Sequence, residues 1–312
     1  MVRALENRCA HRQLKLSLGN VTDNALTCSY HGWTYDESGK CQSIAHSLFG
    51  HKMPNVSVQA FPVQVKHGII FICPGNPDLV ARQVPDIPEW GAASEWGQIA
   101  IDFTWPAHHS MIIDNTCDFT HAYLHRVRKP FTHAELKKLD VDGDSVNLVY
   151  ETKVGQGRFQ KMLVNRKTTD TDSMALGYSY PYQWSNTDNK IKHWCFVLPI
   201  DERTTRAFFL FYFSPAMLKI PGLPFNVPKP LVSAIMPIAK RLMVRPLLDE
   251  DGVAVKAEQE GYDAHFEHPI PDLNPVSHEF QKLTIRKWEE FVNAQPKPVV
   301  RAEHSAARSE VD

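Results

Sequence analysis

The sequence predicts an α+β protein in which a small antiparallel-β domain precedes a larger domain of helices and one central antiparallel sheet. Short β-rich runs separated by turn residues fill the first part of the chain, for example residues 68–73. Alternating apolar and polar residues between positions 146 and 213 predict the strands of the second sheet. Helical spacing of apolar residues begins at Pro106 and returns near the end of the chain.

The composition is that of an ordinary globular protein. The 312 residues are 43% hydrophobic and 22% charged, with a net charge of -1, so nucleic acid is not expected as a partner. Fifteen histidines favour metal chemistry, and six scattered cysteines favour a reducing compartment over a disulfide scaffold. No signal peptide and no apolar run of spanning length is recognised, which predicts a cytoplasmic protein without an integral membrane segment.

We expect the first domain to cover residues 1–95 and to form a small antiparallel sheet. A strand ends at residues 26–28, another starts at 33–35, and Asp36–Gly39 form a turn. Residues 63–65 and 69–72 predict a further strand pair. The proline-rich residues 74–77 and 85–90 then link this domain to the next.

Two short Cys/His motifs lie within this first domain. Cys9 and His11 form one half, and Cys28 and His31 form the other, with sixteen residues between His11 and Cys28. Two thiolates and two neutral imidazoles suit either a tetrahedral zinc ion or a [2Fe–2S] cluster with two Cys on one iron and two His on the other. Spacing alone leaves zinc and cluster open.

The second domain is expected to cover residues 96–294, followed by a disordered polar tail at 295–312. The predicted strands of its sheet are residues 146–150, 158–164, 175–180, 194–199 and 206–213. Their many aromatic residues are expected mostly in the core, with a minority lining a pocket. The proline-broken residues 215–247 predict a packed connection, with a mobile lid or a lipid contact as the alternative. Residues Phe280, Leu283, Trp288 and Phe291 predict an apolar stripe on a last helix.

A helical stretch that starts at Pro106 carries a second candidate metal site. His121 and His125 lie four residues apart, so on a helix they would project from one face, together with Asp118. Without further evidence, two histidines at this spacing are more often residues of the core than metal ligands. A metal site also needs a further ligand from elsewhere in the chain.

Together these motifs resemble those of Rieske non-haem iron oxygenase α subunits. Residues 9–12 and 28–33 match the Rieske pattern C-x-H-R … C-x-x-H-G-W, and Asn115, Asp118 and His121 match N-x-x-D-x-x-H, with His125 as the second histidine. The resemblance implies a helix-grip, START-like catalytic domain. Because only eight residues precede Cys9, it also implies that the first strands of the Rieske domain are missing.

The resemblance implies two iron centres. Cys9, His11, Cys28 and His31 would hold a [2Fe–2S] cluster, and a 2-His-1-carboxylate triad would hold mononuclear Fe(II). Its carboxylate is expected on a helix shortly before a glutamine. Asp251, eight residues before Gln259, is our choice, with Asp249 as the runner-up; the alternative for either acid is a charge favoured by the helix dipole.

The resemblance further implies how subunits and partners are arranged. Asp118 would bridge a Rieske histidine of one subunit to an iron-bound histidine of its neighbour, which implies a homotrimer, with a small β subunit also found in the family. Asn115 belongs to the same catalytic motif. No dinucleotide fingerprint is present, so NAD(P)H would act only through a separate flavin reductase or ferredoxin.

The sequence therefore predicts the terminal component of an oxygenase that uses O2 to hydroxylate a hydrophobic, ring-containing substrate, by monooxygenation or dioxygenation. An oxidative demethylase of the same family is the alternative. From other classes, a non-enzymatic Rieske electron carrier and a zinc-binding module are also considered.

Overall fold

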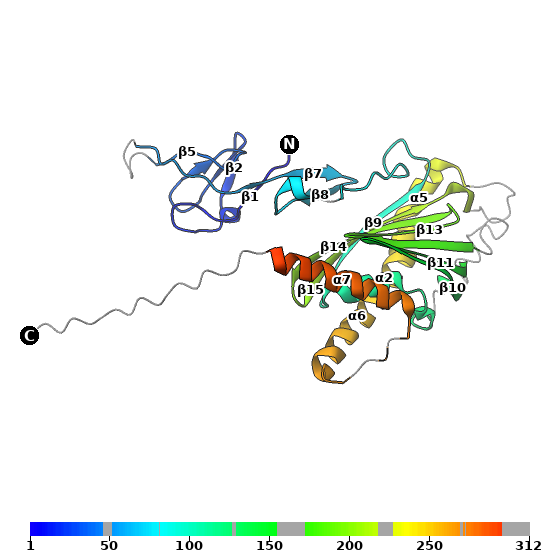
Figure 1. Ribbon diagram of the computed structural model, residues 1–312. Helices are drawn as coiled ribbons and strands as arrows, with labels where there is room; N and C mark the ends of the chain where they lie inside the picture. Colours follow the sequence, from blue (N-terminus) through cyan, green and yellow to red (C-terminus); the bar gives the residue numbers. More distant parts are fainter. Residues whose placement is uncertain are drawn as a thin grey trace, which may run out of the picture. The chain divides into compact units, whose positions relative to one another are not determined.

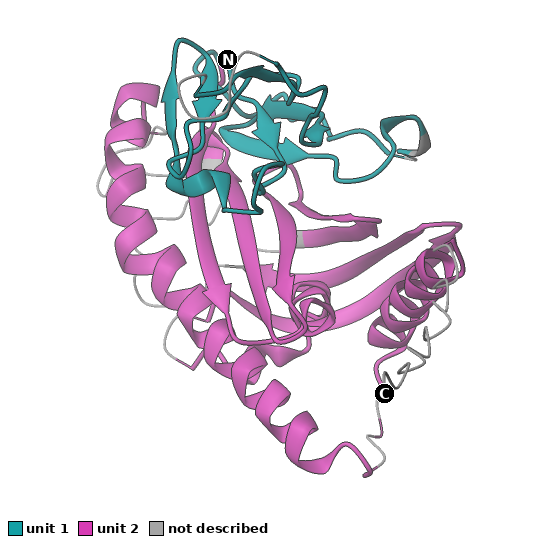
Figure 2. Ribbon diagram, turned by 90° about the vertical axis from the view of Figure 1, so that its left-hand side faces the viewer, with its two compact units in different colours: residues 1–93 teal, residues 94–312 magenta. Residues whose placement is uncertain are grey.

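The computed structural model describes residues 1–45, 52–80, 82–126, 129–154, 172–217, 227–268, 271 and 273–294. The chain divides into two compact units, Met1–Ala93 and Ser94–Asp312, coloured separately in Figure 2. The predicted strand at 158–164 and the predicted tail at 295–312 lie outside the described residues.

The first unit consists of short antiparallel strands. Its four-stranded sheet has the order β2-β3-β4-β5, with bounds Asn20–Thr22, Ala25–Thr27, Thr34–Tyr35 and Cys41–Ser43. Two further pairs are β1 with β6 (Ala4–Leu5 and Ala60–Phe61) and β7 with β8 (Val63–Lys66 and Ile69–Ile72). Short 3-10 turns lie at Leu16–Leu18 and Pro77–Leu79. A small core surrounds the fully buried Tyr35 and includes Cys9, Cys28 and Cys41.

The second unit is built on a seven-stranded antiparallel sheet, in the order β10-β11-β12-β13-β14-β15-β9 (Figure 1). Strand bounds are Gly97–Trp105 for β9, Phe131–Asp142 for β10, Ser145–Val154 for β11, Asp172–Ser179 for β12, Tyr182–Thr187 for β13, Ile191–Asp201 for β14 and Thr204–Phe213 for β15. The first strand in sequence, β9, pairs with the last, β15. This confirms the predicted class, a mixture of helices and antiparallel sheet.

Helices pack on one face of this sheet. They are α2 (His109–Cys117), α5 (Lys229–Ala239), α6 (Arg245–His265) and α7 (Pro275–Ala294), with a π-helical turn at Lys240–Val244 and 3-10 turns at His121–Tyr123 and Pro215–Met217. One core cluster joins α5 and α6 to β9 and β15, and a second joins α2 and α7 to β11 and β12. We call the helix-covered side of the sheet the inner face.

Three strands of the seven-stranded sheet were missed in the sequence, namely β9, β10 and β13. In β10 the register shifts twice, between Thr132 and Glu135 and between Leu136 and Lys138, which disrupts the alternation of side chains. In β13 the inner face carries polar residues, while Trp184 points to the other face, so the usual pattern is inverted. Both departures hide a strand from a search for apolar alternation.

Two expectations about helices need correction. Residues 229–265 are helical throughout, with Pro237 inside α5, so proline does not break the chain there as expected. Val232 and Met236 of α5 pack against β9, as a packed connection requires. The apolar stripe of α7 is only half buried: Phe280 and Leu283 lie in the core, whereas Trp288 is 63% exposed.

Gly252 provides a test of the packing between α6 and β9. A Cβ at this position would lie 2.5 Å from Nε1 of Trp105, a rigid core side chain. We expect Gly252→Ala to lower the free energy of unfolding by about 1–3 kcal/mol, as overpacking of a core does. Gly261→Ala is the matched control, because it lies on the same helix with nothing within 4 Å. Chemical denaturation should show Gly261→Ala unchanged or stabilised; equal stability of both variants would contradict the packing.

Candidate metal centres

The two Cys/His motifs of the first unit form loops of matched conformation. The backbone N–H of Cys9 donates to the carbonyl of Leu14, and that of Cys28 donates to the carbonyl of Trp33. Four residues after each cysteine, at Gln13 and Gly32, an N–H donates back to the cysteine carbonyl, and both residues have positive φ. The two motifs thus form equivalent loops, and each loop ends in a residue with left-handed backbone conformation.

The loops bring their four candidate ligands together. The thiols of Cys9 and Cys28 are buried and hydrogen-bonded to each other. The rings of His11 and His31 lie 4.8 Å apart, and Trp33 stacks on His11 at 4.6 Å. A thiol pair beside an imidazole pair is the donor set of a Rieske cluster, so these residues fit it.

Tyr35 favours the thiolate form of Cys9. Its hydroxyl lies 3.2 Å from Cys9 Sγ and accepts the N–H of Ala10, which leaves its proton for the sulfur. Burial raises the pKa of Cys9, but hydrogen bonds, including those from Tyr35 and the backbone of His11, lower it. Their combined effect is larger than that of burial, so the net change is a decrease. The pKa of His11 is also lowered, by burial and by neighbouring His31 and Arg12. Thiolates and neutral imidazoles are the forms that bind metal.

His121 and His125 do not share one helix, contrary to our expectation. Helix α2 ends at Cys117, and Asp118 is its extended C-cap residue. The Asp118 carboxylate accepts the N–H of Thr120 at 2.6 Å and its hydroxyl at 2.9 Å. Such a local turn competes with helix, so His121 begins a separate 3-10 turn, with His125 just beyond it.

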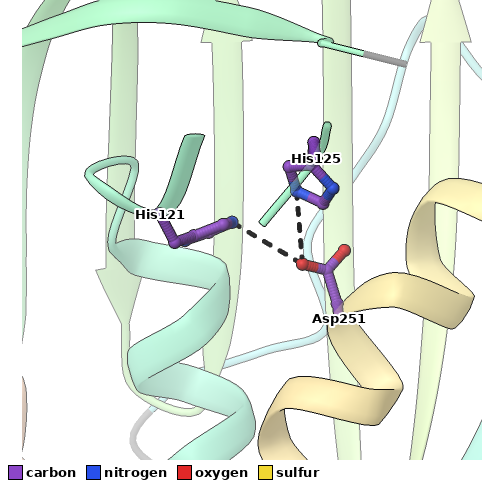
Figure 3. Close-up of side chains that lie close together, drawn as sticks. All are labelled: His121, His125 and Asp251. Atoms are coloured by element: carbon purple, nitrogen blue, oxygen red, sulfur yellow. Dashed lines mark ion pairs between the residues drawn. The ribbon is translucent and has the colours of Figure 1, made fainter. Parts of the chain in front are cut away.

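Asp251 of α6 nevertheless meets both histidines (Figure 3). Its Oδ1 lies 3.6 Å from His121 Nε2 and 3.4 Å from His125 Nε2. One ligand atom from each residue lies within 4.8 Å of the others. The ring of Phe131, the buried first residue of β10, lies 5.5 Å from the His121 ring and 5.8 Å from the His125 ring. It therefore packs against both histidines of the group.

The protonation of this group suits a cation. Asp251 is 5% exposed, and its Oδ1 accepts no hydrogen bond from the residues that the structure describes. Burial raises the pKa of Asp251 to about 6, against the opposing effects of His125 and a hydrogen bond from Asn115. Burial, with His125 beside it, lowers the pKa of His121 to about 4. A buried carboxylate oxygen between two imidazoles fits a 2-His-1-carboxylate iron site.

Glu250 is a site residue that the sequence analysis missed. Its Oε2 lies 2.9 Å from His125 Nδ1, while the adjacent Asp251 faces Nε2 of the same ring. A carboxylate on the distal nitrogen fixes the tautomer and orientation of a metal-binding histidine. The run of three acids at 249–251 was the available signal, but only Asp251 and Asp249 were considered, both as iron ligands.

We expect Glu250→Gln to weaken iron binding at His125 by about 10- to 100-fold, the usual effect of losing such a partner. Competition for Fe(II) with a coloured chelator would measure it. Asp249→Asn is the matched control, because Asp249 is exposed on the same helix and outside the cluster. Equal iron affinity in the two variants would rule out this role for Glu250.

The comparisons with known proteins follow this geometry. Residues 1–49 match the family model of the Rieske [2Fe-2S] domain, and residues 105–291 match that of the vanillate O-demethylase oxygenase C-terminal domain. The chain is 38% identical over 304 residues to a 4beta-methylsterol monooxygenase of Methylococcus capsulatus, covering 95% of this chain and 82% of that protein. The chain belongs to the Rieske oxygenase family.

Other members are more distant from this Rieske oxygenase. A methylxanthine N3-demethylase of Pseudomonas putida is 27% identical over 221 residues, which cover 66% of this chain and 60% of that protein. The crystal structure of dicamba monooxygenase bound to dicamba has a TM-score of 0.71 at 18% identity, over 94% of this chain and 88% of that chain. That likeness shows the shared fold.

Family membership confirms the predicted class of enzyme, an oxygen-dependent oxidoreductase of the terminal oxygenase type. It implies an iron–sulfur cluster and a non-haem iron, and the two donor sets above fit these groups. In the described part of the chain, the helices are too short or too polar to cross a membrane.

Proposed function

We propose that this protein is the terminal component of a Rieske monooxygenase that hydroxylates a methyl group on a hydrophobic polycyclic substrate, with methylated sterols as the candidate class. The observation that carries the reaction type is the meeting of His121, His125 and Asp251 in a chain that also holds the Cys/His loops. The similarity to a 4beta-methylsterol monooxygenase along 95% of the chain supports the substrate class.

The proposed roles of the residues follow from their contacts. Cys9, His11, Cys28 and His31 would hold the cluster, and His121, His125 and Asp251 the mononuclear iron. When bound, the cluster supplies electrons and the iron activates O2. Asn115 orients the Asp251 carboxylate, and Glu250 holds the His125 ring. Phe131 keeps water from one side of both histidines.

Electrons would come from a separate ferredoxin or flavin reductase, with NAD(P)H oxidised there. We further propose a homotrimer in which Asp118 connects the cluster of one subunit to the iron of its neighbour. The Asp118 carboxylate contacts Thr120 of its own chain, and the ring of His121 hydrogen-bonds the Asp118 backbone. This position beside an iron ligand supports the proposed bridge.

Oxidative demethylation is the second candidate, favoured by the match of residues 105–291 to a demethylase domain model. Hydroxylation of a methyl group on oxygen or nitrogen gives an unstable product that loses formaldehyde, so one iron site can serve both reactions. The two candidates therefore differ in substrate rather than in mechanism.

Anaerobic purification followed by turnover with a generic reductase would test the proposal. We expect a Rieske absorption spectrum, about three irons per chain, and incorporation of 18O from O2 into a 4-methylsterol but not into a methylxanthine. His121→Ala should abolish oxygen incorporation while the cluster spectrum remains. Turnover of the methylxanthine with formaldehyde release would favour the demethylase. A colourless, zinc-loaded protein would refute both.

A further inference from the structure

A polar cluster lies on the inner face of the sheet, where apolar residues prevail. Gln183 and Ser185 of β13 are buried there, and Ser185 pairs in register with His193 of β14. Gln183 Nε2 donates to the carbonyl of Thr116 on α2 at 3.3 Å, which shows that these side chains point toward the helices. The neighbouring strands place Leu176 and Cys195 beside them.

The hydrogen bonds of this cluster run in one direction. The Gln183 amide group donates to two backbone carbonyls, so its oxygen faces His193 Nε2 at 3.0 Å and accepts from it. Burial lowers the pKa of His193 to about 4, so the ring is neutral and its Nδ1 is an acceptor. Ser185 Oγ lies 2.6 Å from this Nδ1 and must donate its proton there. Among the residues that the structure describes, no hydrogen bond is donated to Ser185 Oγ, so the cluster ends in an acceptor.

The cluster contacts helix α2, which carries a residue of the iron site. Thr116, which receives the Gln183 bond, directly follows Asn115, the residue that hydrogen-bonds Asp251. On the other side, the ring of Phe211 lies 5.3 Å from His193. His193 is partly buried, whereas its partner Gln183 is fully buried. A polar acceptor thus lies beside an aromatic ring, on strands that pack against the helix of Asn115.

We propose that Ser185 and His193 form the subsite that binds a hydroxyl group of the substrate, with Phe211 against the adjoining hydrocarbon. This rests on the proposed function and deepens it. The substrate hydroxyl donates to Ser185 Oγ. This hydrogen bond anchors one end of a hydrophobic molecule that has few other polar groups. Anchoring that end selects which methyl group lies at the iron.

The subsite predicts a preference for a donor over an acceptor of similar size. A 4-methylsterol carries a ring hydroxyl that can donate, whereas the corresponding 3-ketone can only accept. We expect wild-type kcat/KM to favour the hydroxyl compound by about 10- to 100-fold, the effect of one satisfied against one unsatisfied buried hydrogen bond. Ser185→Ala should reduce this ratio to near one.

The controls separate recognition from structure. Thr187→Val changes a buried hydroxyl on the same strand and face and should keep the wild-type preference. Iron content and the cluster spectrum should be unchanged in both variants. His193→Gln should also lose the preference and release more hydrogen peroxide per O2, because a loosely held substrate is oxidised less often.

Three other results would count against the assignment. A wild-type enzyme that oxidises alcohol and ketone equally would overturn the subsite while leaving the proposed function in place. A Ser185→Ala variant that keeps the preference would do the same. A wild-type enzyme that oxidises neither compound, yet holds both iron centres, would refute the sterol class and the hydroxyl subsite together.

Discussion

Replacing Asp251 with alanine should remove the mononuclear iron and abolish turnover while the cluster remains. Asp251 supplies the carboxylate of the group formed with His121 and His125, and its Oδ1 lies 3.6 Å and 3.4 Å from their Nε2 atoms. Without it, only two imidazoles remain to bind a dication. We expect iron to fall from about three to about two atoms per chain and turnover to fall by more than about 100-fold, the upper range for losing an outer-sphere partner.

Metal analysis, reduced-state EPR and substrate turnover would be measured on one preparation. Asp249→Ala is the matched control, since this acid is exposed two residues earlier on the same helix. It should keep all three irons. Loss of iron in the Asp249 variant, with full iron in the Asp251 variant, would reverse our choice between the two acids.

The first unit shows which parts of a site a sequence can reveal. Its donors lie in two short loops, and each loop closes through backbone hydrogen bonds around its own cysteine. The spacing of the two motifs therefore predicted the four donor residues, and the flanking residues favoured a cluster over zinc. The carboxylate ligand of the iron site was different, because Asp251 lies more than a hundred residues from His125 and no local motif connects them. Its choice depended on the family pattern.

Local polar groups explain what the sequence analysis missed near the iron site. The turn made by Asp118 and Thr120 ends α2, so helical spacing was the wrong basis for pairing His121 with His125. Glu250 was missed because adjacent helix residues normally point in different directions. Here Glu250 and Asp251 reach opposite nitrogens of the same imidazole ring, that of His125.

Strand β13 links a failed prediction to a functional proposal. Its inner face carries Gln183, Ser185 and Thr187, so the alternation that should identify a buried strand is inverted. Buried polar groups cost free energy unless they are hydrogen-bonded, and here Gln183 and Ser185 are. Sequence rules are expected to fail at functional sites. The failure at β13 therefore supports a role in binding the substrate.

The second large effect concerns electron delivery. Asp118→Asn should leave both iron centres in place but slow turnover by about 10- to 100-fold, because an amide cannot accept hydrogen bonds from two imidazoles as a carboxylate can. Stopped-flow reoxidation of the reduced cluster, with O2 and substrate present, would show the slow step directly. Thr120→Val is the control: it removes one of the hydrogen bonds to Asp118 but keeps the carboxylate.

Mixed oligomers would show whether this transfer crosses between subunits. A Cys28→Ser chain should lack the cluster, and an Asp251→Ala chain should lack the mononuclear iron, so each is inactive alone. If Asp118 connects neighbouring chains, refolding or coexpressing the two together should restore part of the activity. Adding Asp118→Asn to both chains should then remove most of that recovery. Mixed oligomers that contain both chains yet stay inactive would place electron transfer within one chain and leave Asp118 without its proposed role.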